Sequence, residues 1–332
     1  MTKGPQHIVF GPMEDYPKSL SEFEARFSTE EECRDYLFRL RWPDGFRCSR
    51  CGQAKAWSIG KSLFECGSCG YQCSVTAGTI FQDTHKPLTL WFRAMWWVTS
   101  QRTGMSAVSL QEALGLGSYR TAWAWLHKLR RAMVRPGRDR LSGRVEVDET
   151  YLGGLEEGLC GRQICNKTLI VVAAEEDGRA TGRIRMRRID SASGKDLHGF
   201  VLEAIEKGSV VHTDGWRGYR GLNKKGYVHD VTPLRGKKNA AIELLPRVHR
   251  AISLLKRWLM GTHHGAVSHK HLDYYLDEFT FRFNRRTSRH RGKLFFRLVQ
   301  QAAAGEPRPY RSLICGHQQQ IPKPRPQHIV VT

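Results

Sequence analysis

Two Cys-x2-Cys pairs lie close together in the first quarter of the chain. Cys48 and Cys51 form the first pair, Cys66 and Cys69 form the second, and 14 residues separate the two pairs. A Cys-x2-Cys turn lets two thiolates converge on one tetrahedral ion at about 2.3 Å, and two such turns close a four-sulfur zinc site. The spacing predicts structural Zn2+ in a small ribbon whose intervening segment forms a hairpin.

Glycine follows the second cysteine of each pair, at Gly52 and Gly70. A zinc knuckle needs a residue that tolerates positive φ at this point. The competing interpretation is a redox-active Cys-x2-Cys motif, which does not come as two paired knuckles. The N-terminal residues have no apolar segment typical of an export signal, so we expect the protein in the reducing cytoplasm.

The charge of the chain is strongly one-sided. Its 332 residues include 53 Lys and Arg against 32 Asp and Glu, a formal net charge of +21. Such an excess favours a polyanionic partner, with nucleic acid as the first candidate. The alternative is a merely solvated basic surface. The sequence lacks an uncharged apolar run of about 18 residues, so we expect no membrane partner.

A helical segment follows the cysteines. Residues 106–114 and 121–133 are expected to be helices joined by a four-residue turn at 115–118, the arrangement of a helix-turn-helix. Its second helix carries an apolar face and a basic one. The predicted DNA-binding residues of this segment are Arg120, Lys128, Arg130 and Arg131. The alternative is an ordinary helical hairpin whose basic face is solvated.

The second half of the chain predicts an α/β fold. Strands are expected over 145–152, 168–175 and 183–189, followed by a helix over 193–207, a strand over 210–213, a strand over 227–231, and helices over 240–260 and 272–284. This order is that of an RNase H-like mixed sheet flanked by helices.

These elements divide the chain into five parts. We expect a flexible arm over 1–30, the zinc ribbon with a leading helix over 31–82, the helical DNA-binding segment over 83–136, the α/β domain over 140–298, and an extended basic tail over 299–332.

Two aspartates stand on apolar strands of the α/β domain. Alternation places Glu146 and Asp148 on one face of the first strand, and Asp214 ends the strand over 210–213. Carboxylates at such positions can share divalent ions, which prefer oxygen ligands. Either aspartate alone also fits a turn or a cap. Their joint presence in a basic, zinc-bearing chain favours a catalytic pair.

Several motifs carry a family resemblance. The ribbon followed by Gln72–Phe81 is similar to the N-terminus of bacterial insertion-sequence transposases. The segments Val147–Gly154 and His212–Tyr219 resemble the first two catalytic strands of their DDE domain. The segments Leu255–Arg257, Gly261–His263 and Lys270–Arg286 resemble the closing helices. The resemblance covers about residues 20–298 and implies an RNase H-like transposase that cuts and joins DNA with two magnesium ions.

The resemblance also implies site residues and partners. The third metal ligand of the family, commonly acidic, falls seven positions before Lys256, where this chain has His249. Glu243 is the alternative carboxylate. Imidazole suits Mn2+ better than Mg2+, so either ion is a candidate cofactor. Lys256 and Arg257 are expected to contact DNA phosphate.

The implied partners are the terminal inverted repeats of the element and target DNA, bound by a homodimer or a larger assembly. The competing functions are a catalytically inactive transposase-derived DNA-binding protein and an RNase H-like nuclease that hydrolyses DNA without joining it. A metal-dependent strand-transfer assay separates the three.

Overall fold

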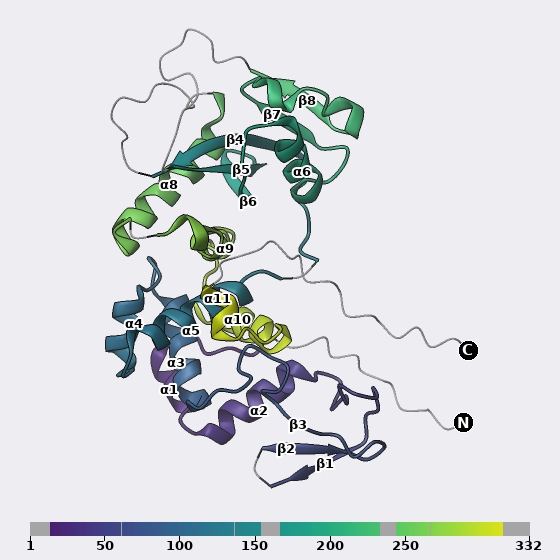
Figure 1. Ribbon diagram of the computed structural model, residues 1–332, viewed down its shortest axis with the longest axis vertical. Helices are drawn as coiled ribbons and strands as arrows, with labels where there is room; N and C mark the ends of the chain where they lie inside the picture. The colour runs from purple at the N-terminus through teal and green to yellow at the C-terminus, as the bar shows by residue number, and fades with distance from the viewer. Residues whose placement is uncertain are drawn as a thin grey trace, which may run out of the picture. The chain divides into compact units, whose positions relative to one another are not determined.

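The computed structural model describes residues 14–60, 62–135, 137–153, 167–232, 244–265 and 267–314. The chain forms two compact units, shown in Figure 1. The first comprises residues up to Ala132 together with Ser288–Arg308. The second comprises Met133–Thr287 and the residues after Arg308. The chain therefore leaves the first unit, builds the second, and returns.

The N-terminal unit combines a small sheet with helices. Its elements are α1 (Leu20–Arg26), α2 (Glu30–Arg41), β1 (Ala56–Ile59), β2 (Leu63–Cys66), β3 (Gln72–Ser74), α3 (Leu88–Ser100), α4 (Ala107–Leu114), α5 (Tyr119–Ala132) and α10 (Gly292–Ala304). The antiparallel sheet has the order β1-β2-β3, so the expected hairpin gains a third strand. Thr29 and Glu32 form a capping box at the start of α2.

The two helices predicted for the helical segment are present as α4 and α5. Ser106 caps α4 by accepting a hydrogen bond from the Ser109 N–H. Gly115 ends this helix in the left-handed conformation, with φ of 60°. The two helices pack against each other, as expected for such a hairpin.

The second unit contains a five-stranded sheet in the order β6-β5-β4-β7-β8. Its elements are β4 (Arg144–Leu152), β5 (Thr168–Asp177), β6 (Ala180–Arg188), α6 (Gly194–Ala204), β7 (Val210–Thr213), η1 (Arg217–Tyr219), η2 (Asn223–Lys225), β8 (Val228–Val231), α8 (Pro246–His263), η3 (His269–His271), α9 (Leu272–Phe283) and α11 (Tyr310–Ile314). The first three strands are antiparallel, and β7 and β8 run parallel to β4. This is the predicted RNase H-like topology.

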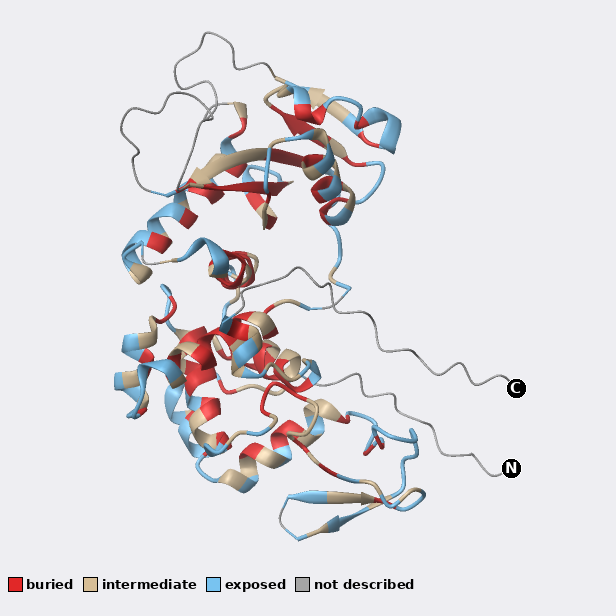
Figure 2. Ribbon diagram, in the orientation of Figure 1, coloured by how far each residue is buried: buried red, intermediate tan, exposed pale blue. Residues whose placement is uncertain are grey.

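Helices cover both faces of this sheet, as Figure 2 shows by the buried strands between them. Alternate strand residues form two cores. One lies under α8 and α9 and includes Val172 and Leu255. The other lies under α6 and includes Val147 and Phe200. The apolar residues of β5 are buried on both sides because the strand lies inside the sheet.

The structure corrects three expected boundaries. The arm predicted over 1–30 is wrong for residues 14–30, because the Tyr36 hydroxyl donates to the Asp15 carbonyl and Phe23 of α1 is buried. The α/β domain predicted to end at 298 differs from the structure, in which α10 belongs to the N-terminal unit. The expected extended tail contains the end of α10 and all of α11, and residues 315–332 lie outside the described chain.

Candidate functional site

The four cysteines of the ribbon form two matching knuckles. In the first, the Gly52 N–H donates to the Cys48 carbonyl at 2.9 Å, and in the second the Gly70 N–H donates to the Cys66 carbonyl at 3.0 Å. Both glycines have positive φ, 76° and 62°, as the sequence predicted. The two turns thus have the same backbone form and present their thiols to one point.

The thiols are spaced for a tetrahedral ion. The Sγ atoms of Cys48 and Cys69 lie 3.7 Å apart, and those of Cys51 and Cys66 lie 3.5 Å apart. A regular tetrahedron with Zn–S bonds of about 2.3 Å has S–S edges of about 3.8 Å. Backbone N–H groups of Ser68 and Cys69 lower the pKa of the Cys66 thiol to about 6, which favours the thiolate that zinc requires. The donor set fits structural zinc.

The acidic face of β4 lies under α8. Asp148 occupies this central strand, and its side chain is 14% exposed. In the parallel register between β4 and β7, Glu146 pairs with His212. Asp148 lies two residues after Glu146, and Asp214 lies two residues after His212. The two aspartates therefore stand side by side, Asp148 on β4 and Asp214 directly after the neighbouring parallel strand β7. The Asp214 carboxylate also accepts a hydrogen bond from the Trp216 N–H at 2.9 Å, which orients it.

His249 reaches this pair from the first turns of α8. Its Nε2 atom lies 3.6 Å from Oδ2 of Asp148. Burial lowers the pKa of His249, and the charges of Glu146 and Asp214 only partly oppose this, so the neutral form of the imidazole is favoured. Its Nε2 is buried and has no hydrogen-bond partner within the described residues. A neutral ring with a free lone pair is the form that ligates a metal.

The structure therefore brings together Asp148, Asp214 and His249, the residues predicted from sequence. Their ligand atoms are more widely spread than the thiols. Among the described residues, the cysteine cluster is the one group of three or more His, Cys, Asp or Glu side chains whose ligand atoms all lie within 4.8 Å of one another. Glu243, the alternative third ligand, lies outside the described residues.

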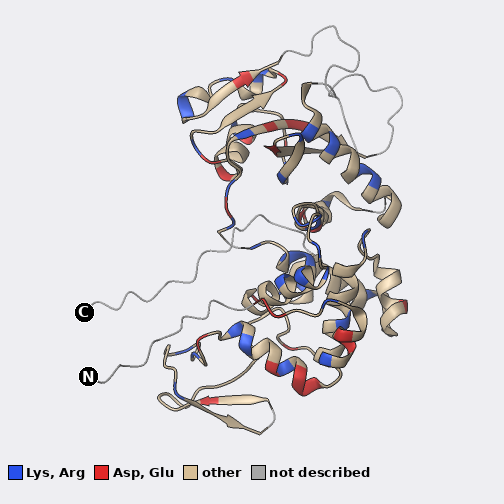
Figure 3. Cartoon of the chain, turned by 180° about the vertical axis from the view of Figure 1, so that it is seen from behind, with Lys and Arg blue, Asp and Glu red and all other residues tan. Residues whose placement is uncertain are grey.

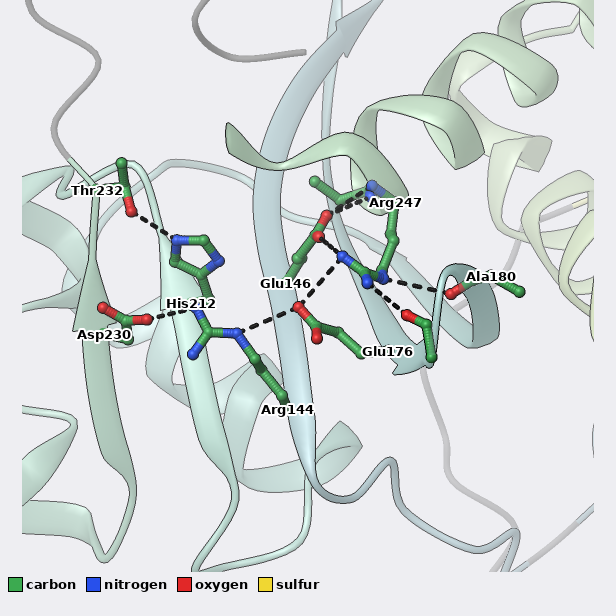
Figure 4. A network of polar contacts seen from close by, with 10 residues as sticks. Arg144, Glu146, Glu176, Ala180, His212, Asp230, Thr232 and Arg247 are labelled. Carbon is green, nitrogen blue, oxygen red and sulfur yellow. Dashed lines mark hydrogen bonds and ion pairs between the residues drawn. The ribbon is translucent and has the colours of Figure 1, made fainter. Parts of the chain in front are cut away.

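Sequence reasoning missed two supports of this site. Glu146 was placed on the Asp148 face by alternation, but the position gave no sign that its carboxylate accepts hydrogen bonds from the start of α8, as Figure 4 shows. Tyr219 is fully buried and donates to Glu149 at 2.9 Å. Burial and the charges of Glu149, Asp148 and Asp214 raise its pKa, so the phenol stays protonated. In the sequence, Tyr219 is marked only by its place at the end of the segment His212–Tyr219, which resembles the second catalytic strand.

The predicted DNA-binding residues differ in exposure. Arg120, at the start of α5, is exposed, and Lys256 and Arg257 are exposed on α8, where Figure 3 shows a succession of basic positions. Lys128 and Arg131 are half-buried.

Arg130 is only 2% exposed, which overturns the expectation that it contacts phosphate in this conformation. The sequence assigns every basic residue of α5 to a solvent-facing side by residue type alone. In the structure the Arg130 side chain lies on the buried side of the helix.

Two histidines at the end of α8 and in η3 make contacts within the second unit. His263 packs edge-on against Trp258 and Tyr275, and the His271 ring contacts the Leu313 carbonyl at 3.1 Å. Within the described part of the chain, no helix is long and apolar enough to cross a membrane.

Two family models of known proteins match separate parts of the chain. Residues 140–284 match the ISXO2-like transposase domain, and residues 28–72 match the transposase zinc-ribbon domain. No curated protein matches the chain. A solved structure, a cryo-EM structure of the simian T-cell lymphotropic virus intasome in complex with PP2A regulatory subunit B56 gamma, is 14% identical, covers 55% of this chain and 68% of that chain, and has a TM-score of 0.29. This likeness is too distant to support a conclusion.

Proposed function

Because the chain carries the zinc ribbon and the DDE domain of an ISXO2-like transposase, we propose that it is a DNA transposase that cleaves DNA at element ends and joins these ends to target DNA. The observation that carries this proposal is the convergence of Asp148 on β4, Asp214 directly after β7 and His249 on α8. In an RNase H-like fold these three elements supply one site at the sheet centre. The contacts described above support a metal-dependent site rather than a set of unrelated strand ends.

Asp148, Asp214 and His249 are the proposed ligands of two divalent ions. Asp148 stands on the central strand and would contact both, with Asp214 and His249 each holding one. When bound, two such ions activate a water or 3′-hydroxyl nucleophile and stabilise the leaving oxygen of phosphoryl transfer. The ligand set carries two negative charges and one imidazole, so it favours Mn2+ over Mg2+ more than an all-carboxylate set would.

The basic residues of α8 and of the helical segment are the proposed DNA contacts. Lys256 lies seven residues after His249 on α8, so the two side chains are about 20° apart around the helix. The positive charge of Lys256 acts on the His249 ring and contributes to its low pKa, which is consistent with this shared face. We propose that Lys256 and Arg257 hold the phosphate next to the scissile bond. Arg120 and the half-buried Lys128 and Arg131 are the proposed contacts from the helical segment.

The proposed partners are the terminal inverted repeats and target DNA, bound by a homodimer or a larger assembly. Structural zinc holds the ribbon, through which the N-terminal unit contributes to DNA binding. Two ends must be cut and joined to one target, so we expect at least two protomers on the DNA.

The decisive experiment is a strand-transfer assay with oligonucleotides that carry the DNA flanking the coding sequence and a supercoiled target plasmid, in Mn2+ or Mg2+. Joined products support the proposal. Hydrolysis without joined products would instead indicate a nuclease, and DNA binding without any cleavage would indicate an inactive relative. Asp214→Asn is the matched control, since it should abolish both products while DNA binding persists.

A further inference from the structure

A buried glutamate lies next to the proposed metal ligands without being one of them. Glu146 stands two residues before Asp148 on β4 and is 1% exposed. Its Oε2 accepts the backbone N–H groups of Arg247 at 2.8 Å and Val248 at 2.9 Å. These N–H groups belong to the first turn of α8 and have no partner within the helix. The carboxylate of Glu146 therefore caps α8 and fixes its start on β4.

The Arg247 side chain completes this attachment. Its Nη1 donates to Oε1 of Glu146 at 3.0 Å, and its Nη2 donates to the Gly178 carbonyl at 2.7 Å. Its Nε donates to the Ala180 carbonyl at 3.3 Å. One guanidinium thus ties β4 and the turn between β5 and β6 to the helix, as Figure 4 shows.

Further charges continue this network across the sheet. Glu176 lies 3.2 Å from Arg247 and 3.2 Å from Arg144, and Arg144 in turn contacts Asp230 at 2.5 Å. Acidic and basic groups alternate along the row, so each charge has an opposite neighbour, although only Glu146 is fully buried. The network connects β4, β5, β8 and α8, and it leaves little freedom for the first turn of the helix.

The position of this attachment sets the geometry of the site. Glu146 and Asp148 point to the same face of β4, about 7 Å apart along the strand. On α8, Val248 is the last residue whose N–H donates a hydrogen bond to Glu146, and His249 follows Val248 directly. A shift of the first turn of α8 along β4 would carry the His249 ring away from Asp148, which it now approaches to 3.6 Å.

We propose that Glu146, acting through Arg247 and the first turn of α8, is a positioning residue that holds His249 against Asp148 and so sets the affinity of the site for divalent ions. This inference rests on the proposed function. A glutamate that merely stabilised the fold would lower stability when replaced but would leave the affinity of the remaining folded protein for metal unchanged.

The chain offers a matched control in Glu175. This glutamate is also buried and also paired with an arginine, since its Oε1 lies 2.6 Å from Nη2 of Arg183. It pairs with Val145 in the register of β4 and β5, so it points to the opposite face of the sheet from Glu146. Glu146→Gln and Glu175→Gln thus remove the same charge from two buried glutamates that each pair with an arginine, one next to the site and one away from it.

The experiment measures Mn2+ binding to the full-length, zinc-loaded protein by isothermal titration calorimetry, with unfolding midpoints recorded in parallel. Both variants should lower the midpoint. Only Glu146→Gln should raise the Kd for Mn2+, by about tenfold or more, while Glu175→Gln stays within about twofold of wild type. Arg247→Lys keeps the charge and the backbone cap but loses the fork to Gly178 and Ala180, and it should raise the Kd by a few-fold. This variant retains the test if Glu146→Gln does not fold.

The outcomes separate the two proposals. An unchanged Kd in the folded Glu146 variant, or in Arg247→Lys if the former is unfolded, overturns the positioning role and leaves the proposed function standing. An equal rise of the Kd in the Glu175 variant also overturns it, because the effect would then follow from stability. If wild type binds no Mn2+ that Asp148→Asn removes, the metal site of the proposed function fails, and the positioning role fails with it.

Discussion

Phe295 of α10 is the side chain on which the N-terminal unit should depend most. It is fully buried, at 0% exposure, although it lies more than 150 residues after α5. Its ring centroid lies between 5.4 and 6.4 Å from those of five aromatic side chains on or next to α1, α2 and α3. These partners are Phe23, Phe27, Tyr36, Phe92 and Trp96.

Replacing this residue by alanine should leave a cavity that the surrounding helices cannot close. Buried Phe→Ala substitutions cost about 3–5 kcal/mol. We expect the upper part of this range, because the ring contacts three helices and five aromatic rings at once, and favourable ring pairs add about 0.5–1.5 kcal/mol beyond their area. A loss of this size removes a large part of the roughly 5–15 kcal/mol that stabilises an ordinary domain.

Hydrogen exchange with mass-spectrometric readout can assign the loss to one unit. At about 1.4 kcal/mol per factor of ten, protection of α2, α3 and α10 should fall roughly 10³- to 10⁴-fold in Phe295→Ala, while β4 and β5 keep their protection. Phe200→Ala, in the buried face of α6, should give the opposite pattern. Unchanged protection of α3, or an equal loss in β5, would refute the assignment of α10 to the N-terminal unit.

Four further predictions concern the zinc, the charge and the proposed catalytic residues. Cys66→Ser should lose the zinc, measured by atomic absorption, and open the ribbon to hydrogen exchange while β4 and β5 stay protected, because the ligands are local; simultaneous unfolding of both units would contradict this. Affinity for DNA should fall with salt at a log–log slope of about −0.9 per phosphate contact, and a flat titration would mean that the +21 charge is not used. Asp148→Asn should abolish plasmid cleavage but retain or improve DNA binding in a mobility-shift assay, and lost binding would point to a folding role of β4. His249→Ala should impair strand transfer, whereas His249→Glu should keep it and improve the use of Mg2+; full activity of His249→Ala in Mg2+ would show that another residue is the third ligand.

The sequence predicted the local features of the fold because their causes are local. The positive φ of Gly52 and Gly70 follows from the geometry of a Cys-x2-Cys turn, whatever the rest of the chain does. Polar and apolar residues alternate in some strands and apolar residues run continuously in others, according to the place of each strand in the sheet. This pattern allowed the central position of β4 and the face of Asp148 to be inferred. The place of His249 beside Asp148 was implied only by the family resemblance, which puts the third ligand seven positions before Lys256.

Tertiary context decided what the sequence did not predict. The apolar face of α10 indicates burial but not against which unit, so the expected boundary at 298 fell inside this helix. The residues next to Arg130 in the sequence do not show whether its side chain is buried or exposed. Glu146 could be assigned to a face but not to a partner, because its hydrogen-bond donors lie 101 and 102 positions away in the chain.

That long separation has a consequence for the order of events during folding. Asp148, Asp214 and His249 meet only after β7 has paired with β4 and α8 has docked on Glu146, 102 positions downstream. Contacts of such high sequence separation form late, because the entropy of closing the intervening loops must be overcome first. The knuckles of the ribbon, in contrast, close over about twenty residues. If the chain acts as proposed, a partly folded copy would bind DNA through its ribbon and basic helices before its metal ligands meet, so DNA cleavage would require the complete fold.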